Sequence, residues 1–398
     1  MVSTRWGGLV ARALFYMSSH RNAHIDAEAV HLANITGLAA KALQSWYSPT
    51  EGGWNTGGWW HDANCLTVLA DWAIYSAPNK DVNVTGIIAN TFVNAQKTGE
   101  HVGKRLSTTA QMASTAKYGA NMKRGFPEFI NEFYDDEGWW ALAWIRSYDL
   151  TKNLEYLNMA ERIFSDMQGG VDEICGGGIM WNKTRKYKAA IANELYLSVA
   201  ASLANRVQGS RDKYLQIAKD QWTWFQNSGL INKHNLINDG LTSADGTCLN
   251  NKQPTWSYNQ GVILGGLVEL SKAAGNESYL APAVDIAKAA IAALGDKEGI
   301  INEIDHCEPN CGDDGPQFKG IFIRNLHYLY KAVLNQDFAA TIKKNADSIW
   351  AKNRDPETNR LGISWVGPPE LGIGPTARTH SCAMDVLVAA MGVVAGNK

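Results

Sequence analysis

The chain has 398 residues, of which 45% are hydrophobic and 19% charged, and its formal net charge is −2. Such a composition suits a globular protein with a large core, and near-neutrality gives no electrostatic reason to expect nucleic acid or an anionic membrane as partner. The 15 tryptophans and 14 tyrosines supply flat, amphipathic rings. Such rings fill cores or line sites that bind apolar faces and hydroxyls together, as sugars present them.

Apolar residues recur with helical spacing along the whole chain. Each periodic stretch is long enough, and rich enough in alanine and leucine, to favour helix over strand. In chain order the predicted helices cover 26–44, 61–76, 82–97, 137–150, 153–169, 189–206, 211–227, 256–274, 279–294, 317–335, 338–351 and 379–395.

The connections between these helices alternate in length. Short turns such as APNKD, VQGS and GNES close antiparallel hairpins, whereas long stretches rich in Gly, Trp, Asn and Pro precede every second helix. Six such hairpins that close on themselves form an (α/α)6 barrel, an all-α fold; an open solenoid is the alternative. No linker of biased composition interrupts the pattern, so we expect a single domain over 1–398.

The long loops should all lie on one rim, at the N-terminal ends of the inner helices, and this rim should carry the functional site. Aromatic and polar residues concentrate in these loops, in EGGWNTGGWWHDANC, YDDEGWW, CGGGIMWNK, QPTWSYNQG, GPQFKGIFIRN and ISWVGPPE. A single tryptophan beside glycines often only plugs the end of a barrel. Six such motifs on one rim favour a binding site, and we expect the opposite rim to be plain scaffold.

Two consecutive aspartates, Asp135 and Asp136, stand at the start of one predicted inner helix. Acidic residues are common there because they complement the helix dipole and cap free N–H groups. Glu137 already supplies such a residue, however, and capping does not require the flanking rings of Tyr134, Trp139 and Trp140. The pair therefore suggests chemistry rather than capping alone.

Glycoside cleavage requires two carboxyl groups on either side of the scissile bond. Adjacent side chains at a helix mouth can straddle a substrate, with carboxyls about 5 Å apart, near the spacing of retaining enzymes and below that of inverting ones. The pattern thus predicts retention of configuration through a covalent glycosyl-enzyme intermediate.

The motifs YDDEGWWALAWIRSYDLT, GGGIMWN, KAAIANELYL, NDGL and WSYNQGVILGGLVEL closely resemble those of glycoside hydrolase family 76, the endo-α-1,6-mannanases of bacteria and fungi. The resemblance runs from GGWWHDAN to FKGIFIRNLHYL and is carried by several motifs in the family's order. It implies an (α/α)6 barrel and retaining, endo-acting hydrolysis of α-1,6-linked mannan backbones, with no cofactor and no metal. It also implies that Asp135 is the nucleophile and Asp136 the acid/base.

The same family includes fungal wall enzymes thought to transfer GPI-linked mannan onto glucan, and these typically carry glutamine and Phe-Trp after the pair and a membrane-anchoring tail. Here Glu137, Gly138, Trp139 and Trp140 follow, and no such tail is visible, which favours a hydrolase over a cell-wall transglycosylase. By loop position we expect rings to stack on sugar and amides or a carboxylate to bind hydroxyls. The expected contacts are Trp60, Asn64, Trp139, Asn193, Asp239, Trp256, Tyr258 and Asn259.

Two rivals belong to other classes. A Mg²⁺-dependent prenyl or terpene synthase would use an Asp-rich motif in an all-α fold, but it needs carboxylates a helical turn apart and a basic cluster for diphosphate. A non-catalytic mannan-binding protein would share the aromatic rim. The intact Asp135-Asp136 pair argues against it.

Cysteine and asparagine patterns indicate the compartment. Cys307 and Cys311 lack the partner CxxC of a zinc site, so a disulfide is the better interpretation. Four Asn-X-Ser/Thr sequences, at Asn34, Asn83, Asn182 and Asn276, fit a glycoprotein. Without a signal peptide, long apolar run or hydrophobic tail, we expect a mature, secreted monomer that binds α-mannan and neither inserts into a membrane nor binds nucleic acid.

Overall fold

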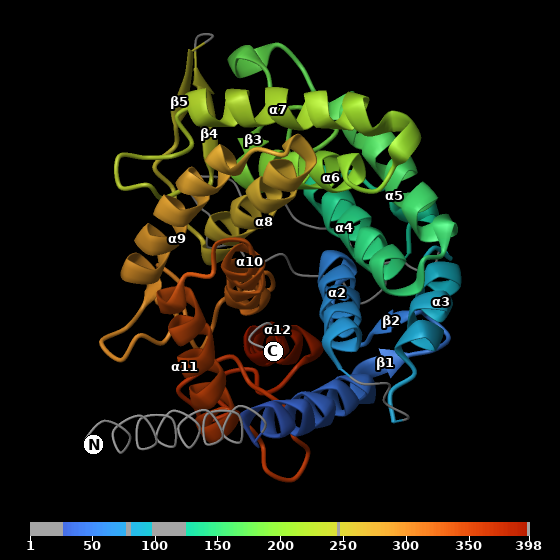
Figure 1. The fold of residues 1–398 in the computed structure, drawn as a ribbon, viewed down its shortest axis with the longest axis vertical. Coiled ribbons are helices and arrows are strands. Elements are labelled where there is room, and N and C mark those ends of the chain that lie inside the picture. The colour runs from blue at the N-terminus through green and yellow to red at the C-terminus, as the bar shows by residue number, and fades with distance from the viewer. Residues whose placement is uncertain (1–26, 77–80, 98–124, 245–246, 396–398) are drawn as a thin grey trace, which may run out of the picture.

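The computed structural model describes residues 27–76, 81–97, 125–244 and 247–395, which are mostly helical (Figure 1). An inner set of helices follows the long loops. It comprises α2 (Trp59–Tyr75), α4 (Tyr134–Thr151), α6 (Ala190–Ala204), α8 (Ser257–Ala274), α10 (Phe318–Val333) and α12 (Ala377–Ala395). The outer set comprises a helix over 27–43 together with α3 (Val84–Asn94), α5 (Leu154–Met167), α7 (Arg211–Asn227), α9 (Leu280–Leu294) and α11 (Gln336–Lys352).

The inner helices close into a ring. Each packs against the next in chain order, from α2 through α4, α6, α8 and α10 to α12, and α12 packs back against α2. Figure 1 shows this ring end-on, with α3, α5, α7, α9 and α11 around it. The prediction of an (α/α)6 barrel is therefore confirmed, and the open solenoid is excluded.

Burial distinguishes the two rings. Every residue of α6 is buried, because it contacts neighbours on both sides and an outer helix behind. The outer helices bury one face only, and three of them begin at an asparagine whose side chain accepts a backbone N–H: Asn83, Asn153 and Asn335. Such caps satisfy donors that the first turn leaves open. Local chemistry thus sets where the outer helices start.

Glycines allow the inner helices to approach closely. A Cβ on Gly320 of α10 would lie 2.3 Å from the carbonyl oxygen of Cys382 in α12, and one on Gly261 of α8 would lie 2.6 Å from Cα of Phe322. Any other residue would force these backbones apart.

Two small antiparallel sheets, which the sequence did not predict, order the long loops. Strands β1 (Tyr47–Ser48) and β2 (Gly53–Trp54) pair before α2. Strand β3 (Lys188–Ala189) pairs with β4 (Gly240–Ala244), which pairs with β5 (Thr247–Asn250). In register, Ala189 faces Gly240. This second sheet joins the loop before α6 to the loop before α8.

Two disulfides cross-link loops on the same rim. Cys307 pairs with Cys311, which confirms the disulfide prediction there, and Cys175 pairs with Cys248 of β5 across 73 residues of sequence. Cys65 and Cys382 are buried thiols.

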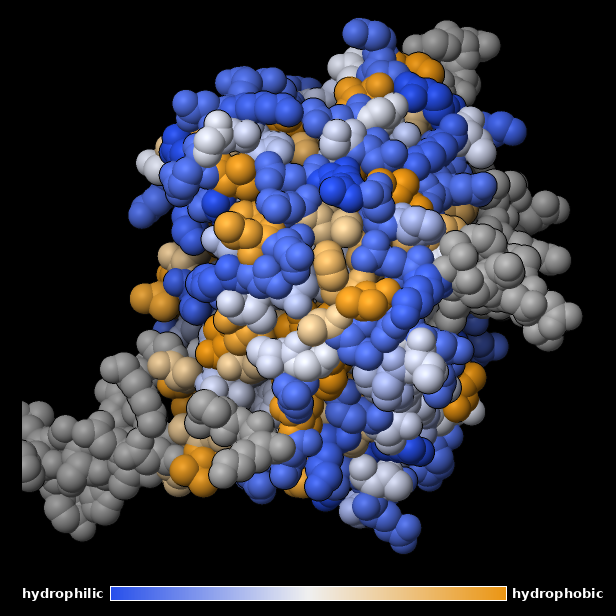
Figure 2. All heavy atoms as spheres, turned by 90° about the vertical axis from the view of Figure 1, so that its right-hand side faces the viewer, coloured by the Kyte–Doolittle hydropathy of each residue, from blue (hydrophilic) through white to orange (hydrophobic). Residues whose placement is uncertain are grey.

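The surface of the face that carries α3 and α5 is shown in Figure 2, where apolar side chains lie in small groups between polar ones. Within the described residues, every helix is too short or too polar to cross a membrane.

Candidate active site

The two aspartates lie in the first turn of α4, which begins at Tyr134, three residues before the predicted start. Both are buried, with 6% of Asp135 and 3% of Asp136 exposed. The Asn131 side chain sets this start: its Oδ1 accepts the N–H of Phe133 at 2.8 Å, and its Nδ2 donates to Oδ2 of Asp136 at 2.8 Å. One amide therefore both shapes the turn before the helix and orients the Asp136 carboxyl.

Glu137 fastens this turn from the other side. Its Oε1 accepts the backbone N–H of Asn131 at 3.2 Å and lies 3.1 Å from Nζ of Lys183, which also contacts Asp166 at 2.7 Å. Burial raises the pKa of Glu137 to about 9, against the attraction of Lys183. Glu137 thus supports the loops around the pair, as its acidic first-turn position suggested.

Asp239 approaches the pair from the loop before α8. Its Oδ2 accepts the hydroxyl of Tyr187, whose oxygen in turn accepts Nδ2 of Asn251 at 2.8 Å. Burial raises the pKa of Asp239, and the charge of Asp135 adds to this effect. The second sheet brings Tyr187, Asp239 and Asn251 together, since Gly240 of β4 pairs beside Ala189 of β3.

Aromatic rings form a continuous series around the starts of four inner helices. Trp139 of α4 stacks on Trp60 of α2 at 5.7 Å between ring centroids, and Trp60 faces Phe318 of α10 at 6.2 Å. Tyr258 of α8 stacks on Phe318 at 3.9 Å with the rings 5° from parallel, and Trp256 lies 5.8 Å from Phe318. The indole N–H of Trp60 donates to Asp314 at 2.9 Å.

The acidic and aromatic groups form one cluster. Burial raises the pKa of Tyr258 well above its ordinary value, and the charges of Asp239, Asp135, Asp314 and Glu194 raise it further. Five expected contacts, Trp60, Trp139, Asp239, Trp256 and Tyr258, are thereby brought together with Asp135. We call this set, with Asp136 and Phe318, the rim cluster.

The remaining expected contacts lie deeper. The Asn193 amide bonds the backbone of Ile179 through both its ends, at 2.8 and 2.9 Å, and also donates to the carbonyl of Ala189. Asn64 accepts a guanidinium N–H of Arg324 and donates to the carbonyl of Trp60. These bonds favour a supporting role for both amides, and their contact with sugar stays a prediction.

Asn259 and Glu194 differ from these amides. Both are fully buried on neighbouring helices, and within the described residues neither side chain makes a hydrogen bond. Burial raises the pKa of Glu194 well above its ordinary value, and the charge of Asp239 adds to this. Burial thus favours the neutral form of the Glu194 carboxyl near Asp239.

Some rings of the loop motifs are core residues. Trp140 is fully buried between Trp59, Phe129 and Trp144, and Trp54 and Trp365 are also buried. Adjacent residues on a helix point about 100° apart, so Trp139 turns towards Trp60 in the barrel interior while Trp140 turns towards Trp59 and Phe129.

Sequence reasoning missed four residues of this region: Asn131, Tyr187, Glu194 and Phe318. Phe318 lies in a motif of the long loops, Asn131 and Tyr187 lie near one, and Glu194 lies within α6. Only Asn131 had a local signal, as an asparagine shortly before an acidic helix start. Among the described residues, no group of three or more His, Cys, Asp or Glu side chains is arranged to hold a metal ion.

An all-α barrel of six hairpins, with two consecutive aspartates and stacked rings where its inner helices begin, has the organisation of a carbohydrate-active protein. The sequence model of glycosyl hydrolase family 76 matches residues 32–393, and the chain belongs to this family. The resemblance noted from the motifs is thus confirmed.

Named relatives share parts of this chain. Mannan endo-1,6-alpha-mannosidase DCW1 of Candida albicans is 29% identical over 211 residues, which are 48% of this chain and 46% of that protein. The enzyme of the same name from Saccharomyces cerevisiae is 25% identical over 316 residues, 74% of this chain and 64% of that protein. This chain therefore covers less than two thirds of either relative.

Similar folds extend to bacteria. An inactive variant of the alpha-1,6-mannanase GH76A of Salegentibacter sp. HEL1_6, with two consecutive aspartates replaced, in complex with alpha-1,6-mannotetrose, superposes with a TM-score of 0.72 at 20% identity. The match covers 90% of this chain and 98% of that one. Dfg5 from Chaetomium thermophilum, in complex with glucosamine, gives a TM-score of 0.70 at 18% identity over 92% of this chain and 90% of that one. These similarities support the fold.

Proposed function

We propose that this protein is a retaining, endo-acting glycoside hydrolase that cleaves α-1,6-mannosidic linkages within mannan backbones. The main observation behind this proposal is the position of Asp135 and Asp136. They are consecutive in the first turn of α4 and lie beside a cluster of stacked aromatic rings. The names of the relatives supply the linkage and the sugar. The bacterial mannanase variant, which is inactive after replacement of two consecutive aspartates, supports a catalytic role for the consecutive aspartates of this chain.

In this mechanism Asp135 attacks the anomeric carbon while Asp136 donates its proton to the glycosidic oxygen. The bond between the anomeric carbon and the glycosidic oxygen breaks, and the leaving chain carries the proton away. Asp136, now a carboxylate, takes a proton from water, and the resulting hydroxide displaces Asp135 from the anomeric carbon. Asn131, bonded to Oδ2 of Asp136, keeps the acid/base in one orientation during both steps.

The rings and Asp239 bind the substrate in this proposal. Trp256 and Tyr258 are partly exposed and offer apolar faces to pyranose rings, and Asp239, fixed by Tyr187, accepts hydroxyl hydrogens. Trp60 and Trp139, which are 4% and 3% exposed, complete the aromatic series behind them. Neutral mannan suits a chain of net charge −2. The proposal also includes a single-domain, secreted monomer; Asn34, Asn83 and Asn276 are exposed and so accessible to glycosylation, whereas Asn182 is buried.

The test is cleavage of linear α-1,6-mannan, measured as new reducing ends. Wild type should release oligosaccharides, and Asp135→Asn and Asp136→Asn should each lower kcat by at least about 10³-fold, because each removes one chemical role. Asp212→Asn, an exposed aspartate on α7, is the matched control and should leave kcat unchanged. If the protein binds mannan but releases no product, the hydrolase proposal is wrong and the protein only binds mannan.

Stereochemistry is tested separately by NMR of the first product. Early accumulation of the α-anomer is expected, and the β-anomer would contradict retention. Products longer than the substrate would show that a sugar hydroxyl replaces water in the second step, which is the transglycosylase alternative.

A further inference from the structure

The end of the barrel opposite the rim cluster is not the plain scaffold that the loop pattern suggested. It holds a cavity of about 720 Å³ among the last turns of α2, α4, α6, α8 and α10, of a size that suits a small ligand. Asp149 in its wall lies thirteen residues along α4 from Asp136, or about 20 Å at the rise of a helix. The polar wall of the cavity is therefore distant from the acidic pair, although Trp139 of the rim cluster also lines the cavity.

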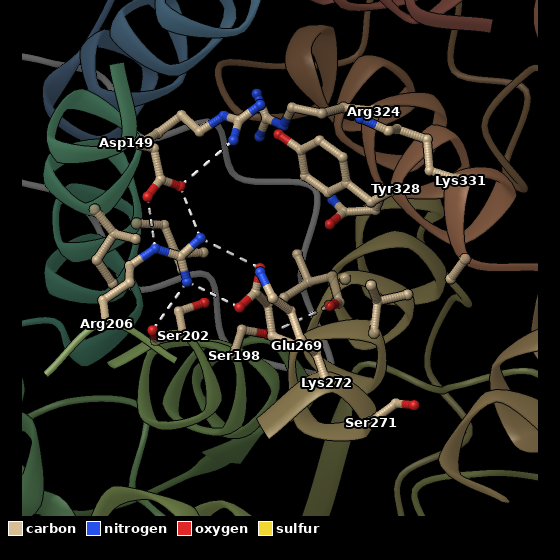
Figure 3. A pocket seen from close by; sticks show the side chains of 18 of the residues that line it. Asp149, Ser198, Ser202, Arg206, Glu269, Ser271, Lys272, Arg324, Tyr328 and Lys331 are labelled. Carbon is tan, nitrogen blue, oxygen red and sulfur yellow. Dashed lines mark hydrogen bonds and ion pairs between the residues drawn. The ribbon is translucent and has the colours of Figure 1, made fainter. Parts of the chain in front are cut away.

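A rigid polar network forms one wall of the cavity, as Figure 3 shows. Arg206 donates to both carboxylate oxygens of Asp149, at 2.8 and 2.7 Å, and to Glu269 at 2.8 Å. These three side chains come from or directly follow three different inner helices and are 12–24% exposed. All five N–H groups of Arg206 are bonded within this network, so the carboxylates that it holds present fixed acceptors to a ligand.

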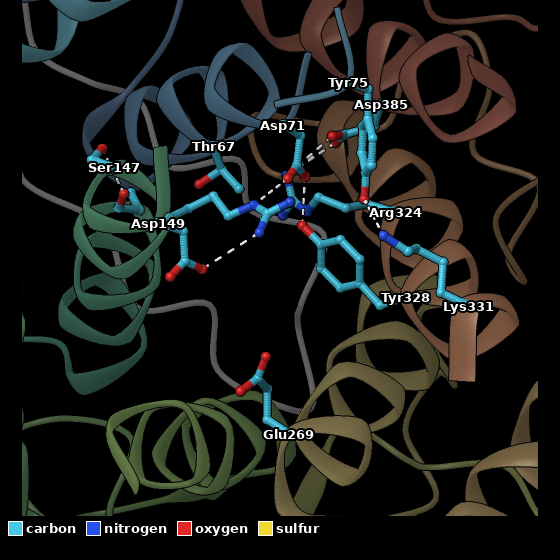
Figure 4. Close-up of polar contacts among 12 residues, drawn as sticks. Thr67, Asp71, Tyr75, Ser147, Asp149, Glu269, Arg324, Tyr328, Lys331 and Asp385 are labelled. Carbon is cyan, nitrogen blue, oxygen red and sulfur yellow. Dashed lines mark hydrogen bonds and ion pairs between the residues drawn. The ribbon is translucent and has the colours of Figure 1, made fainter. Parts of the chain in front are cut away.

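The network continues behind the wall. Figure 4 shows Asp71 close to Tyr328 and Arg324. The Asp71 carboxylate accepts hydrogen bonds from the Tyr328 hydroxyl and from the guanidinium of Arg146. Arg324 bonds both oxygens of Asp385 at 3.2 Å. The arrangement of the wall is thus fixed before any ligand arrives.

Hydrogen-bonding capacity remains in this wall. Asp149 accepts two bonds from Arg206 and one from Arg146, and Glu269 accepts two from Arg206 and one from Asn205. A carboxylate has about four acceptor positions. Counting the bonds of the described residues, each of these two partly exposed carboxylates can therefore accept one more hydrogen.

The charges of the cavity balance. Of the described residues, five cations line it and five carboxylates either line it or bond to its lining: Arg146, Arg206, Lys272, Arg324 and Lys331, with Asp71, Asp149, Glu269, Glu277 and Asp385. The C-terminal ends of the inner helices add partial negative charge. An isolated anion is disfavoured by those helix ends, and a cation by the guanidinium and ammonium groups.

The remaining lining mixes apolar side chains with hydroxyl groups. Leu142, Val262 and Val268 supply carbon surface, and Ser198 and Ser202 supply hydroxyls. A ligand must therefore offer hydroxyls to one side and carbon–hydrogen surface to the other, without net charge, which is the chemistry of a pyranose.

We propose that this cavity is a second carbohydrate-binding site, which takes one end of a neutral oligosaccharide chain while the rim cluster acts on another stretch. The identity of that sugar as α-1,6-mannan rests on the proposed function. Two sites on one molecule raise the retention of the protein on a polymer through effective concentration, without changing the chemistry at the rim.

The test uses the Asp135→Asn variant and titration calorimetry with linear α-1,6-mannotetraose. Asn276 lies at the cavity lining in an Asn-Glu-Ser sequence, so the chain is produced in a host that adds no N-glycan. Two binding sites per chain are expected. Val268→Phe, which fills the cavity, and Ala332→Trp, at an exposed lining position, should each weaken one of them at least tenfold.

Val93→Phe, on an exposed position of α3, is the matched control and should keep both sites. Thermal unfolding of each variant checks its fold, and Ala332→Trp carries the test should Val268→Phe fail to fold. A single site, or two sites unaffected by both cavity variants, overturns the inference. Two sites in a protein that never cleaves mannan would instead refute the proposed function and leave the second site standing.

Discussion

At the level of single residues, the acidic pair depends on an uncharged neighbour. Asn131 contacts Asp136 through one end of its amide and the backbone of Phe133 through the other. Replacing it removes the group that orients Asp136, the proposed acid/base, but leaves both carboxylates and all the rings in place.

We therefore expect Asn131→Ala to lower kcat about 100-fold with little change in KM, because a small misorientation of a catalytic group has an effect of this size. Steady-state kinetics on linear α-1,6-mannan measure it. Asn153→Ala, at the exposed cap of α5, is the control and should affect stability alone. An unchanged kcat in Asn131→Ala would show that the contact has no part in catalysis.

The burial of Glu194 predicts how the stability of the protein depends on pH. The pKa of Glu194 is raised above the ordinary value of 4.5 by burial first and by Asp239 second, so its neutral form stabilises the fold. This contribution is fully present below pH 4.5 and declines as the pH rises above that value towards the folded-state pKa, since the unfolded chain then binds fewer protons. Glu137, with a pKa of about 9, acts in the same direction.

Glu194→Gln should therefore unfold at a higher temperature than wild type at pH 8, with the difference vanishing near pH 4. It should keep most activity, because glutamine is uncharged and burial disfavours the charged form of Glu194. Melting curves between pH 4 and pH 9 measure this. Glu298→Gln, at a half-exposed side chain, should follow wild type at every pH. A Glu194→Gln protein that is stable but inactive would mean that an ionised carboxylate is needed there.

At the level of elements, the loop before α8 is held by a covalent bond as well as by β pairing. The Cys175–Cys248 disulfide links β5 to the turn before Gly177 and Gly178 across 73 residues. Asp239 directly precedes β4 in the same sheet, so the disulfide also restrains a residue of the rim cluster.

Replacing both cysteines by serine should lower the free energy of unfolding by about 4 kcal/mol on the chain-entropy view, and raise KM for mannan as Asp239 loosens. The matched control is the Cys307–Cys311 pair, four residues apart, whose loss should cost about 2 kcal/mol on the same view. Denaturant unfolding and steady-state kinetics give both numbers. Equal losses from the two pairs would contradict this account.

At the level of the whole molecule, the ring depends on close contacts between inner helices. Gly320 of α10 faces the backbone of α12, where a Cβ added to this glycine would lie 2.3 Å from the Cys382 carbonyl oxygen. This contact lies in the last part of the ring, where α12 also meets α2.

Gly320→Ala should therefore destabilise the protein by about 1–3 kcal/mol or more, as overpacking of a fixed core does, and should lower activity because both ends of the barrel shift. Gly209→Ala, where an added Cβ meets nothing within 4 Å, is the control and should be neutral or slightly stabilising. Chemical denaturation measures both variants. A neutral Gly320→Ala would show that the ring can widen locally.

Much of this architecture follows from local sequence. The inner and outer helices match the periodic stretches within a few residues, because helical spacing and short turns are local properties. The start of α4 was placed three residues late, since the turn that begins it depends on the Asn131 side chain. The two-residue strands were missed because such short pairings exist only through their partners.

The six-hairpin pattern, the family and the acidic pair could all be predicted from the amino-acid sequence, since periodicity, loop length and contiguous motifs act between near neighbours. The folded chain decided between the predicted closed barrel and an open solenoid, and it revealed a cavity at the far end that the sequence did not predict. These outcomes depend on contacts such as Trp60 with Asp314, 254 positions apart. No local pattern specifies such pairs, because they form only when the last helix packs against the first.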